Sequence, residues 1–280
     1  MRSDLHLHST ASDGADSPAA VIRTAASLGL DGVALTDHDT LTGIPEAQDA
    51  ADEVGIRLIA GVELSVDHDG AKMHMLVYGL DPDKGALQDR LEELRQGRTF
   101  RNEKIVSALV DLGFDITIED VRAHAKGPSV GRPHIADALV AKGYVSTRDE
   151  AFEHLLHDGG AAYFSRTRLS AVEAIRLGTA SGGVCVIAHP KTVNLRAGPF
   201  EQALRDLKSV GLGGLEAHHP MHDLDLRKHL EDLADDFGLI ATGGSDYHGK
   251  DKRQFLIGTG TGDLRVPRTA FDEITAAIGR

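Results

Sequence analysis

Near its amino terminus the chain reads Asp4-Leu5-His6-Leu7-His8-Ser9-Thr10-Ala11-Ser12-Asp13-Gly14. Leucines alternate with His6 and His8, so a β-strand would place both imidazoles on the same face. Asp13 follows in a polar turn that can return a carboxylate to the end of that strand. Imidazole and carboxylate groups are common ligands of divalent metals. The stretch therefore predicts the first half of a metal-dependent hydrolase site.

Composition favours a globular protein with one large domain and a smaller one. The chain has 280 residues, a length ordinary for an α/β barrel with an insertion. Of these, 41% are hydrophobic and 26% charged, as in soluble globular proteins. Its net charge of -13 argues against a protein that coats long duplex nucleic acid. The single cysteine, Cys185, lies in an apolar run and is interpreted as a buried hydrophobe. No leader or membrane-length apolar run is recognised, so we expect a cytoplasmic protein without a membrane partner.

A repeated strand-then-helix pattern runs through most of the sequence. Ser17-Pro18 predicts the start of a helix over residues 19–28, and Gly55 ends a second helix over residues 44–54. About seven such units are counted, as in parallel barrels. Helices dominate between residues 83 and 167. We therefore predict an α/β barrel at residues 1–85 and 166–280, with a small helical substrate-binding domain inserted at residues 86–165.

Ligand-type side chains follow nearly all of the predicted strands. In parallel barrels these carboxyl ends meet at one mouth, where so many buried polar groups would be poorly satisfied without cations. Glu63, at the end of its predicted strand, is the expected bridging ligand because its two oxygens can bond separate ions. The full set of expected metal ligands is His6, His8, Asp13, His38, Glu63, His74, His189, Asp246 and His248.

Five motifs together resemble the PHP (polymerase and histidinol phosphatase) family. They are Asp4 to Gly14, Thr36-Asp37-His38-Asp39, Gly61-Val62-Glu63, Ala188-His189-Pro190 and Gly244-Ser245-Asp246-Tyr247-His248. The resemblance implies a distorted (β/α)7 barrel that binds three divalent ions, with manganese expected ahead of iron or zinc. It implies one ion on His6, His8, Glu63 and Asp246, a second on Glu63, His74 and His189, and a third on Asp13, His38 and His248.

Aspartate at position 13, where many members of the family have histidine, and the helical insertion resemble a branch of small nucleotide phosphoesterases. That branch releases phosphate from nucleoside 3′,5′-bisphosphates or trims short RNA from its 5′ end. The resemblance therefore implies a metal-dependent phosphoesterase that hydrolyses phosphate monoesters of nucleotides. Its expected partners are a small nucleotide or the 5′ end of short single-stranded RNA.

Two features of the insertion suggest substrate contacts. Gly131-Arg132-Pro133-His134 begins a predicted helix and resembles a segment of that branch; an arginine fork and a helix start both suit phosphate. Arg95, Arg98, Arg101 and Lys104 recur every three residues on one side of a helix. A solvated helix face remains the alternative. The expected substrate contacts are Asp13, Arg98, Arg101, Asn102, Arg132, His134, His219 and His248.

The segment Glu216-Ala217-His218-His219-Pro220-Met221-His222 supplies the expected catalytic residues. Either His219 or His222 could donate a proton to the leaving group. Both could instead orient metal ligands, and the sequence leaves the two roles open.

Three other functions fit parts of the pattern. A histidinol-phosphatase-like phosphomonoesterase would use the same ligands. An amidohydrolase also opens with two histidines on a strand, but it uses a carboxylated lysine where this chain has Glu63. A non-catalytic metal-binding PHP module of a replication assembly is the third alternative.

Overall fold

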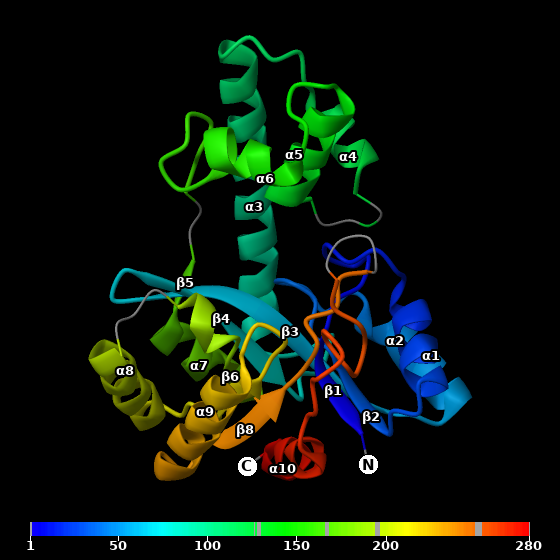
Figure 1. Cartoon of the computed structure of the whole chain (residues 1–280), viewed down its shortest axis with the longest axis vertical. Helices are drawn as coiled ribbons and strands as arrows, with labels where there is room; N and C mark the ends of the chain where they lie inside the picture. The colour runs from blue at the N-terminus through cyan, green and yellow to red at the C-terminus, as the bar shows by residue number, and fades with distance from the viewer. Residues whose placement is uncertain are drawn as a thin grey trace. The chain divides into compact units, whose positions relative to one another are not determined.

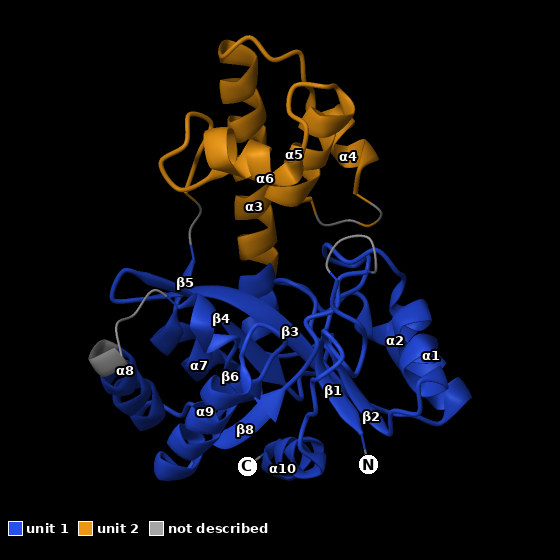
Figure 2. Ribbon diagram, viewed as in Figure 1, with its two compact units in different colours: residues 1–91, 168–280 blue, residues 92–167 orange. Residues whose placement is uncertain are grey.

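The structure is a computed structural model that describes residues 2–125, 127, 130–165, 168–193, 197–249 and 254–279. The chain divides into two compact units, shown in different colours in Figure 2: Met1–Leu91 with Arg168–Arg280, and Glu92–Thr167. Residue 166, the expected second boundary, lies outside the described residues. Each unit has a hydrophobic core of its own.

The first unit is built on a sheet that nearly closes on itself (Figure 1). After β8 the chain returns to β1, where Tyr247 bridges Leu7. The short strand β5 (Leu169–Ser170) pairs with β3 outside the main order. This arrangement confirms the predicted distorted barrel. In the order of pairing, the strands are β1 (Ser3–Leu7), β2 (Gly32–Leu35), β3 (Arg57–His68), β4 (Ala71–Tyr78), β6 (Val184–Ile187), β7 (Gly214–His218) and β8 (Ile240–Gly243).

The repeated strand-then-helix units suggested parallel strands throughout, and this is wrong for β4. This strand pairs antiparallel with both β3 and β6. The turn after His68 is so short that it can join β3 and β4 only as antiparallel strands. The hairpin also lengthens β3, so Glu63 lies in the middle of that strand and not at its end. Its register places Glu63 opposite Leu76, and His74 opposite Ser65. The hairpin therefore brings a carboxylate and an imidazole together.

Helices surround this sheet, and their ends follow the sequence signals. Ser17 accepts a hydrogen bond from the backbone N–H of Ala20, and Pro18 occupies the first turn of α1. Gly55 ends α2 in a left-handed conformation, with φ of 73°. Phe271 of α10 packs into the barrel core beside Leu5. The helices are α1 (Pro18–Ser27), α2 (Ile44–Val54), α7 (Ala171–Ala180), α8 (Ala197–Ser209), α9 (Leu224–Asp236) and α10 (Arg268–Ala277).

The second unit is helical. Thr117 and Asp120 form a capping box at the start of α4, and Ile105, Leu109, Ile135 and Leu139 are fully buried in its core. Among the described residues, no helix of either unit combines the length and the apolar character needed to cross a bilayer. The second unit contains most of α3 (Ala86–Asp111), whose residues up to Leu91 belong to the first unit. Its other elements are α4 (Ile118–Ala123), α5 (Arg132–Ala141), α6 (Arg148–Ala151) and the π-helical segment η1 (Phe152–Leu156).

Asp4 ties the first strand to the two segments that follow the last one. Its fully buried carboxylate accepts backbone hydrogen bonds from Ser245 N at 2.8 Å and from Gly258 N at 2.7 Å. Gly244 allows this approach, because a Cβ there would lie 2.4 Å from the backbone nitrogen of His6. The same contacts position the loop that carries Asp246 and His248.

Replacing Asp4 by asparagine should destabilise the barrel, because an amide has one acceptor oxygen for two buried N–H groups. We expect the free energy of unfolding to fall by about 1–3 kcal/mol, the cost of a buried unsatisfied group. Denaturant titration measures it. Asp67→Asn is the control: half-buried Asp67 accepts a hydrogen bond from Gly70 N, which an amide oxygen preserves. Equal stability of the two variants would show that the two hydrogen bonds of Asp4 do not stabilise the barrel.

Candidate metal centre

His6 on β1 and His8 just beyond it face two carboxylates from distant parts of the chain. Oε2 of Glu63 lies 3.3 Å from His6 Nε2 and 3.2 Å from His8 Nε2. Oδ1 of Asp246 lies 3.5 Å and 3.3 Å from the same two nitrogens. All four residues are buried, and their ligand atoms lie within 4.8 Å of one another. This is a group that could hold one cation.

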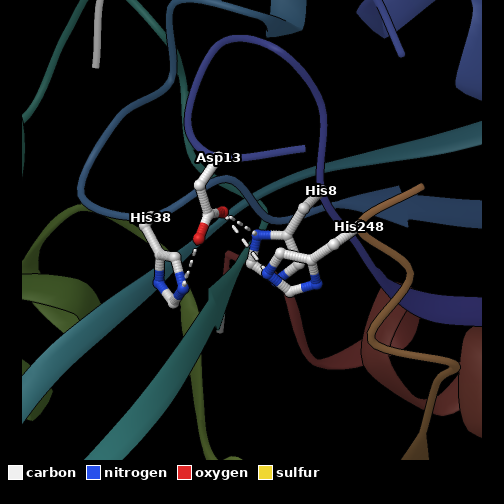
Figure 3. A group of neighbouring side chains, drawn as sticks. All are labelled: His8, Asp13, His38 and His248. Atoms are coloured by element: carbon white, nitrogen blue, oxygen red, sulfur yellow. Dashed lines mark ion pairs between the residues drawn. The ribbon is translucent and has the colours of Figure 1, made fainter. Parts of the chain in front are cut away.

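A second group lies around Asp13 (Figure 3). Asp13 Oδ1 is 3.3 Å from His248 Nε2 and 4.0 Å from His8 Nδ1, and Oδ2 is 4.0 Å from His38 Nε2. The three imidazoles come from segments after β1, β2 and β8. In Figure 3 the carboxylate of Asp13 lies between His38 and the neighbouring rings of His8 and His248. This group could hold another cation.

Glu63 joins the first group to a third. His38 Nδ1 lies 3.1 Å from Glu63 Oε2, and His74 Nδ1 lies 2.7 Å from Glu63 Oε1. His189 Nε2 contacts the same Oε1 at 2.9 Å. His38, Glu63 and His74 have ligand atoms close enough to share an ion. Both carboxylate oxygens of Glu63 are therefore placed to bridge neighbouring cations.

The loop that carries Asp13 is held by Asp37, which the sequence reasoning did not select. Asp37 is buried and accepts hydrogen bonds from Ser9 N at 2.8 Å, Ser9 Oγ at 2.6 Å and Ser12 Oγ at 2.5 Å. Three donors on one carboxylate fix the turn. Its position beside His38 was the available sequence signal.

Glu216 on β7 is the other residue that the sequence reasoning missed. It is fully buried, and its carboxylate contacts His6 Nδ1 at 2.9 Å and His189 N at 2.6 Å. His189 has φ of 26°, a conformation that costs a residue with a side chain about 1–3 kcal/mol and persists only when its surroundings enforce it. A carboxylate within the apolar strand was the signal that could have identified it.

The electrostatics of the cluster suit cations. Burial lowers the pKa of His38 to about 3, so its ring is neutral and can ligate. Burial also acts to lower the pKa of His8, but Asp246 and Glu63 outweigh it and raise the pKa to about 9. Burial would raise the pKa of Glu63, yet His38, His74 and His6 hold it well below its usual range. The carboxylate is therefore ionised.

Several ligand atoms of this cluster lack hydrogen bonds. Within the described part of the chain, this holds for the buried atoms His6 Nε2, His8 Nε2, His248 Nε2 and Glu63 Oε2. Buried polar atoms are normally satisfied, and leaving them without partners is costly. Nitrogen and carboxylate donors in this number are the ligands of divalent transition metals. The residues thus fit a metal centre.

His219 and His222 lie beside the cluster in different states. His219 Nδ1 accepts a hydrogen bond from Met221 N at 3.2 Å, and its Nε2 lies 3.4 Å from Asp246 Oδ2. His222 Nδ1 lies 2.9 Å from Ala217 O, so that nitrogen donates. Burial lowers the pKa of His222 to about 4. Because Nδ1 of His219 accepts a hydrogen bond, the N–H of its neutral ring is on Nε2. In His222 the N–H is on Nδ1, and the low pKa leaves this ring neutral at pH 7.

The expected substrate residues of the insertion gather within the second unit. Arg101 Nε donates to Asn102 Oδ1 at 3.1 Å, and Asn102 Nδ2 donates to Val130 O at 2.8 Å. A Cβ at Gly131 would lie 3.6 Å from Arg98 Nη1, which brings α3 close to the start of α5.

The other two insertion residues are held by local contacts. His134 Nδ1 accepts from Gly131 N at 3.1 Å. Arg132 donates from Nη1 to Leu156 O at 2.9 Å, and its guanidinium carbon lies 5.7 Å from the ring centre of Tyr163. Leu156 and Tyr163 thus fix the orientation of the Arg132 side chain.

An α/β barrel with imidazoles and carboxylates gathered in one cluster is the arrangement of a metal-dependent hydrolase. Residues 4–147 match the family model described as PHP domain. The chain belongs to the PHP family.

Curated relatives support the assignment to this family. The chain is 36% identical to a 5′-3′ exoribonuclease of Haemophilus influenzae over 88% of this chain and 89% of that protein. It is 34% identical to a 3′,5′-nucleoside bisphosphate phosphatase of Chromobacterium violaceum, over 99% and 98%. A phosphoribosyl 1,2-cyclic phosphate 1,2-diphosphodiesterase of Eggerthella lenta is 32% identical, over 95% and 100%.

Two solved structures have the same fold. One, from Bifidobacterium adolescentis, is described as a metal-dependent phosphoesterase and is 34% identical, with a TM-score of 0.87 over 98% of this chain and 96% of that chain. The other, an amidohydrolase from Chromobacterium violaceum with bound sulfate and no metal, is 32% identical, with a TM-score of 0.88 over 100% and 98%. The curated relatives and the structure from Bifidobacterium adolescentis confirm the predicted enzyme class, a metal-dependent phosphoesterase.

Because Glu63 belongs to two ligand groups and Asp13 to one, their variants should differ in metal content. Glu63→Gln should lose ions from both of its groups, whereas Asp13→Asn should lose only the ion beside His38 and His248. Elemental analysis after dialysis against manganese measures the ions per chain. Glu53→Gln, an exposed partner of Arg23, is the control. Equal losses for Glu63→Gln and Asp13→Asn would contradict a bridging Glu63.

Proposed function

We propose that this chain hydrolyses phosphate monoesters of nucleotides, with nucleoside 3′,5′-bisphosphates as the first substrate class and the 5′ end of short RNA as the second. The observation that carries the proposal is the cluster of buried imidazoles and carboxylates centred on Glu63. The names of the Haemophilus and Chromobacterium relatives support the substrate classes. A phosphate monoester needs its negative charge offset, which such a cluster is equipped to do.

The proposed ligands are the nine residues expected from the sequence, and the proposed cofactors are three divalent ions, manganese first with iron or zinc as alternatives. His6, His8, Glu63 and Asp246 would hold one, and Asp13, His38 and His248 another. Glu63, His74 and His189 would hold the third, and the short contacts of both rings with Glu63 Oε1 support this set. When bound, such ions activate water and offset charge on the phosphoryl oxygens.

His219 is the proposed proton-bearing group next to the substrate. The backbone N–H of Met221 occupies its Nδ1, so the ring presents an N–H at Nε2, beside Asp246. That N–H would donate to an oxygen of the phosphoryl or leaving group. With its pKa lowered to about 4 by burial, His222 is a poor proton donor at neutral pH. Its bond to Ala217 O instead supports a role in orienting the loop.

The proposed second-phosphate contacts are Arg98, Arg101, Arg132 and His134, with Asn102 contacting a sugar or base. The proximity of α3 and α5 within the second unit supports this assignment. Arginine forks bind phosphate with strong charge-assisted hydrogen bonds. His134 accepts a hydrogen bond from Gly131 N at Nδ1, so the N–H of its neutral ring is on Nε2.

A phosphate-release screen tests the proposed function. Purified protein with manganese should release inorganic phosphate from adenosine 3′,5′-bisphosphate and leave a nucleoside monophosphate. The same preparation is offered histidinol phosphate, 5′-phosphorylated oligoribonucleotides, phosphoribosyl 1,2-cyclic phosphate and simple amides. Preferred turnover of histidinol phosphate, the cyclic phosphate or an amide would replace the proposal with that activity. Full metal occupancy without any turnover would indicate a non-catalytic PHP module.

Arg98→Ala and Arg101→Ala should separate the two phosphates of the substrate. Loss of a charge-assisted contact, worth about 1.5–3 kcal/mol, should lower kcat/KM for the bisphosphate by roughly 10- to 100-fold. Activity on 4-nitrophenyl phosphate, which has one phosphate, should stay unchanged. The control is Arg122→Ala, an exposed arginine of the same unit that pairs with Glu119. Equal losses on both substrates would exclude a second-phosphate role.

A further inference from the structure

The two carboxylate oxygens of Glu216 serve two different strands. Oε1 lies 2.9 Å from Nδ1 of His6 on β1, and Oε2 accepts a hydrogen bond of 2.6 Å from the backbone N–H of His189, just after β6. Glu216 itself lies on β7 and is fully buried, with 0% of its surface accessible to water. One side chain, which is not itself an expected ligand, therefore contacts two of the proposed ligands.

The contact with His6 decides which ring nitrogen faces the centre. Oε2 of Glu216 accepts from the backbone N–H of His189 at 2.6 Å, and Oε1 lies 2.9 Å from Nδ1 of His6. A carboxylate group only accepts hydrogen bonds, so Nδ1 of His6 is the nitrogen that carries the proton of this contact. Nε2 is the nitrogen that faces Glu63 and Asp246, and in the neutral ring it is the one that offers a lone pair.

The contact with His189 acts on the backbone. The left-handed φ of 26° at this residue directs Nε2 of the ring toward Glu63 Oε1 at 2.9 Å, while Nδ1 contacts Thr192 Oγ1 at 2.8 Å. The bond from His189 N to Glu216 is one of the constraints that hold this conformation.

We propose that Glu216 is a positioning residue: it holds His6 in the tautomer with the proton on Nδ1 and fixes the backbone of His189, so that Nε2 of both rings faces the candidate metal centre. The inference rests on the part of the proposed function that assigns divalent ions to this cluster, and on no particular substrate. No neutral isostere can replace the carboxylate, because glutamine has one acceptor oxygen. The backbone N–H of His189 would take that oxygen, and the amide NH₂ would force the proton of His6 onto Nε2.

The test compares wild type with Glu216→Gln by two measurements that do not involve catalysis. Nitrogen-15 NMR of histidine-labelled, metal-free protein reports the tautomer of His6. It is recorded at a pH high enough for the ring to be neutral, because burial, which acts to lower the pKa of His6, is outweighed by Glu216 and Glu63, which raise it. The His6 signal is identified by its loss in His6→Gln. Manganese titration against a competing chelator reports affinity. We expect the proton of His6 on Nδ1 in wild type and on Nε2 in Glu216→Gln. Manganese affinity should fall by roughly 10- to 100-fold, as for other residues that orient metal ligands.

Glu231→Gln is the matched control, because Glu231 also pairs with a histidine that lies next to the site, His218, at 3.0 Å. It should leave manganese affinity and the His6 signal unchanged. A proton on Nε2 of His6 in wild type would overturn the proposal, and this measurement holds even if Glu216→Gln fails to fold. Lost affinity with an unchanged tautomer would also overturn it. Absence of phosphatase activity in wild type would contradict the proposed function while leaving both readouts intact.

Discussion

Glu63 makes the interaction on which the rest of the barrel depends. It is 1% exposed, and imidazoles from four other segments of the chain contact its two oxygens: His6, His38, His74 and His189. An ionised carboxylate at this depth is tolerable only with such partners or with cations. The sheet must therefore close far enough to bring β1, β4 and the segments after β2 and β6 around β3.

Other buried carboxylates hold the segments that supply those partners. Asp37 fixes the turn that carries Asp13, Asp4 fixes the chain after β8, and Glu216 links β1 to the segment after β6. Each uses both oxygens as acceptors of hydrogen bonds. Part of the negative charge of the chain therefore belongs to Asp4, Asp37 and Glu216, which order the loops around the candidate metal centre and are not among its expected ligands. This division suits a site whose geometry must exist before its ligand arrives.

Local patterns predicted much of this fold, because they depend on neighbours in sequence. The alternation of His6 and His8 with leucines predicted the face of β1. Ser17-Pro18 predicted the start of α1, and Gly55 the end of α2. Long-range geometry was less accessible. The direction of β4 depends on the length of one turn, and the role of Glu216 depends on contacts with residues 27 and 210 positions away. Expected ligands such as Glu63 and Asp246 do lie together, although their binding of metal stays a prediction.

In the second unit, the spacing of basic residues did not predict how their side chains are packed. Spacing by three predicted a basic helix face, yet Arg101 is buried beside Asn102, and Arg132 is held by Leu156 and the ring of Tyr163. Arginines with such local contacts are already ordered, which lowers the entropic cost of binding an anion. The proposed phosphate contacts therefore rest on preorganisation within the unit.

The central claim is that these imidazoles and carboxylates surround a cluster of cations. Anomalous diffraction at the manganese edge, from crystals grown with manganese, tests it most directly. The account predicts anomalous peaks about 2.0–2.3 Å from the nearest side-chain nitrogen and oxygen atoms, two of them each beside a different oxygen of Glu63. A cluster without anomalous density, with His6, His8 and Asp246 bonded only to one another or to water, would contradict it.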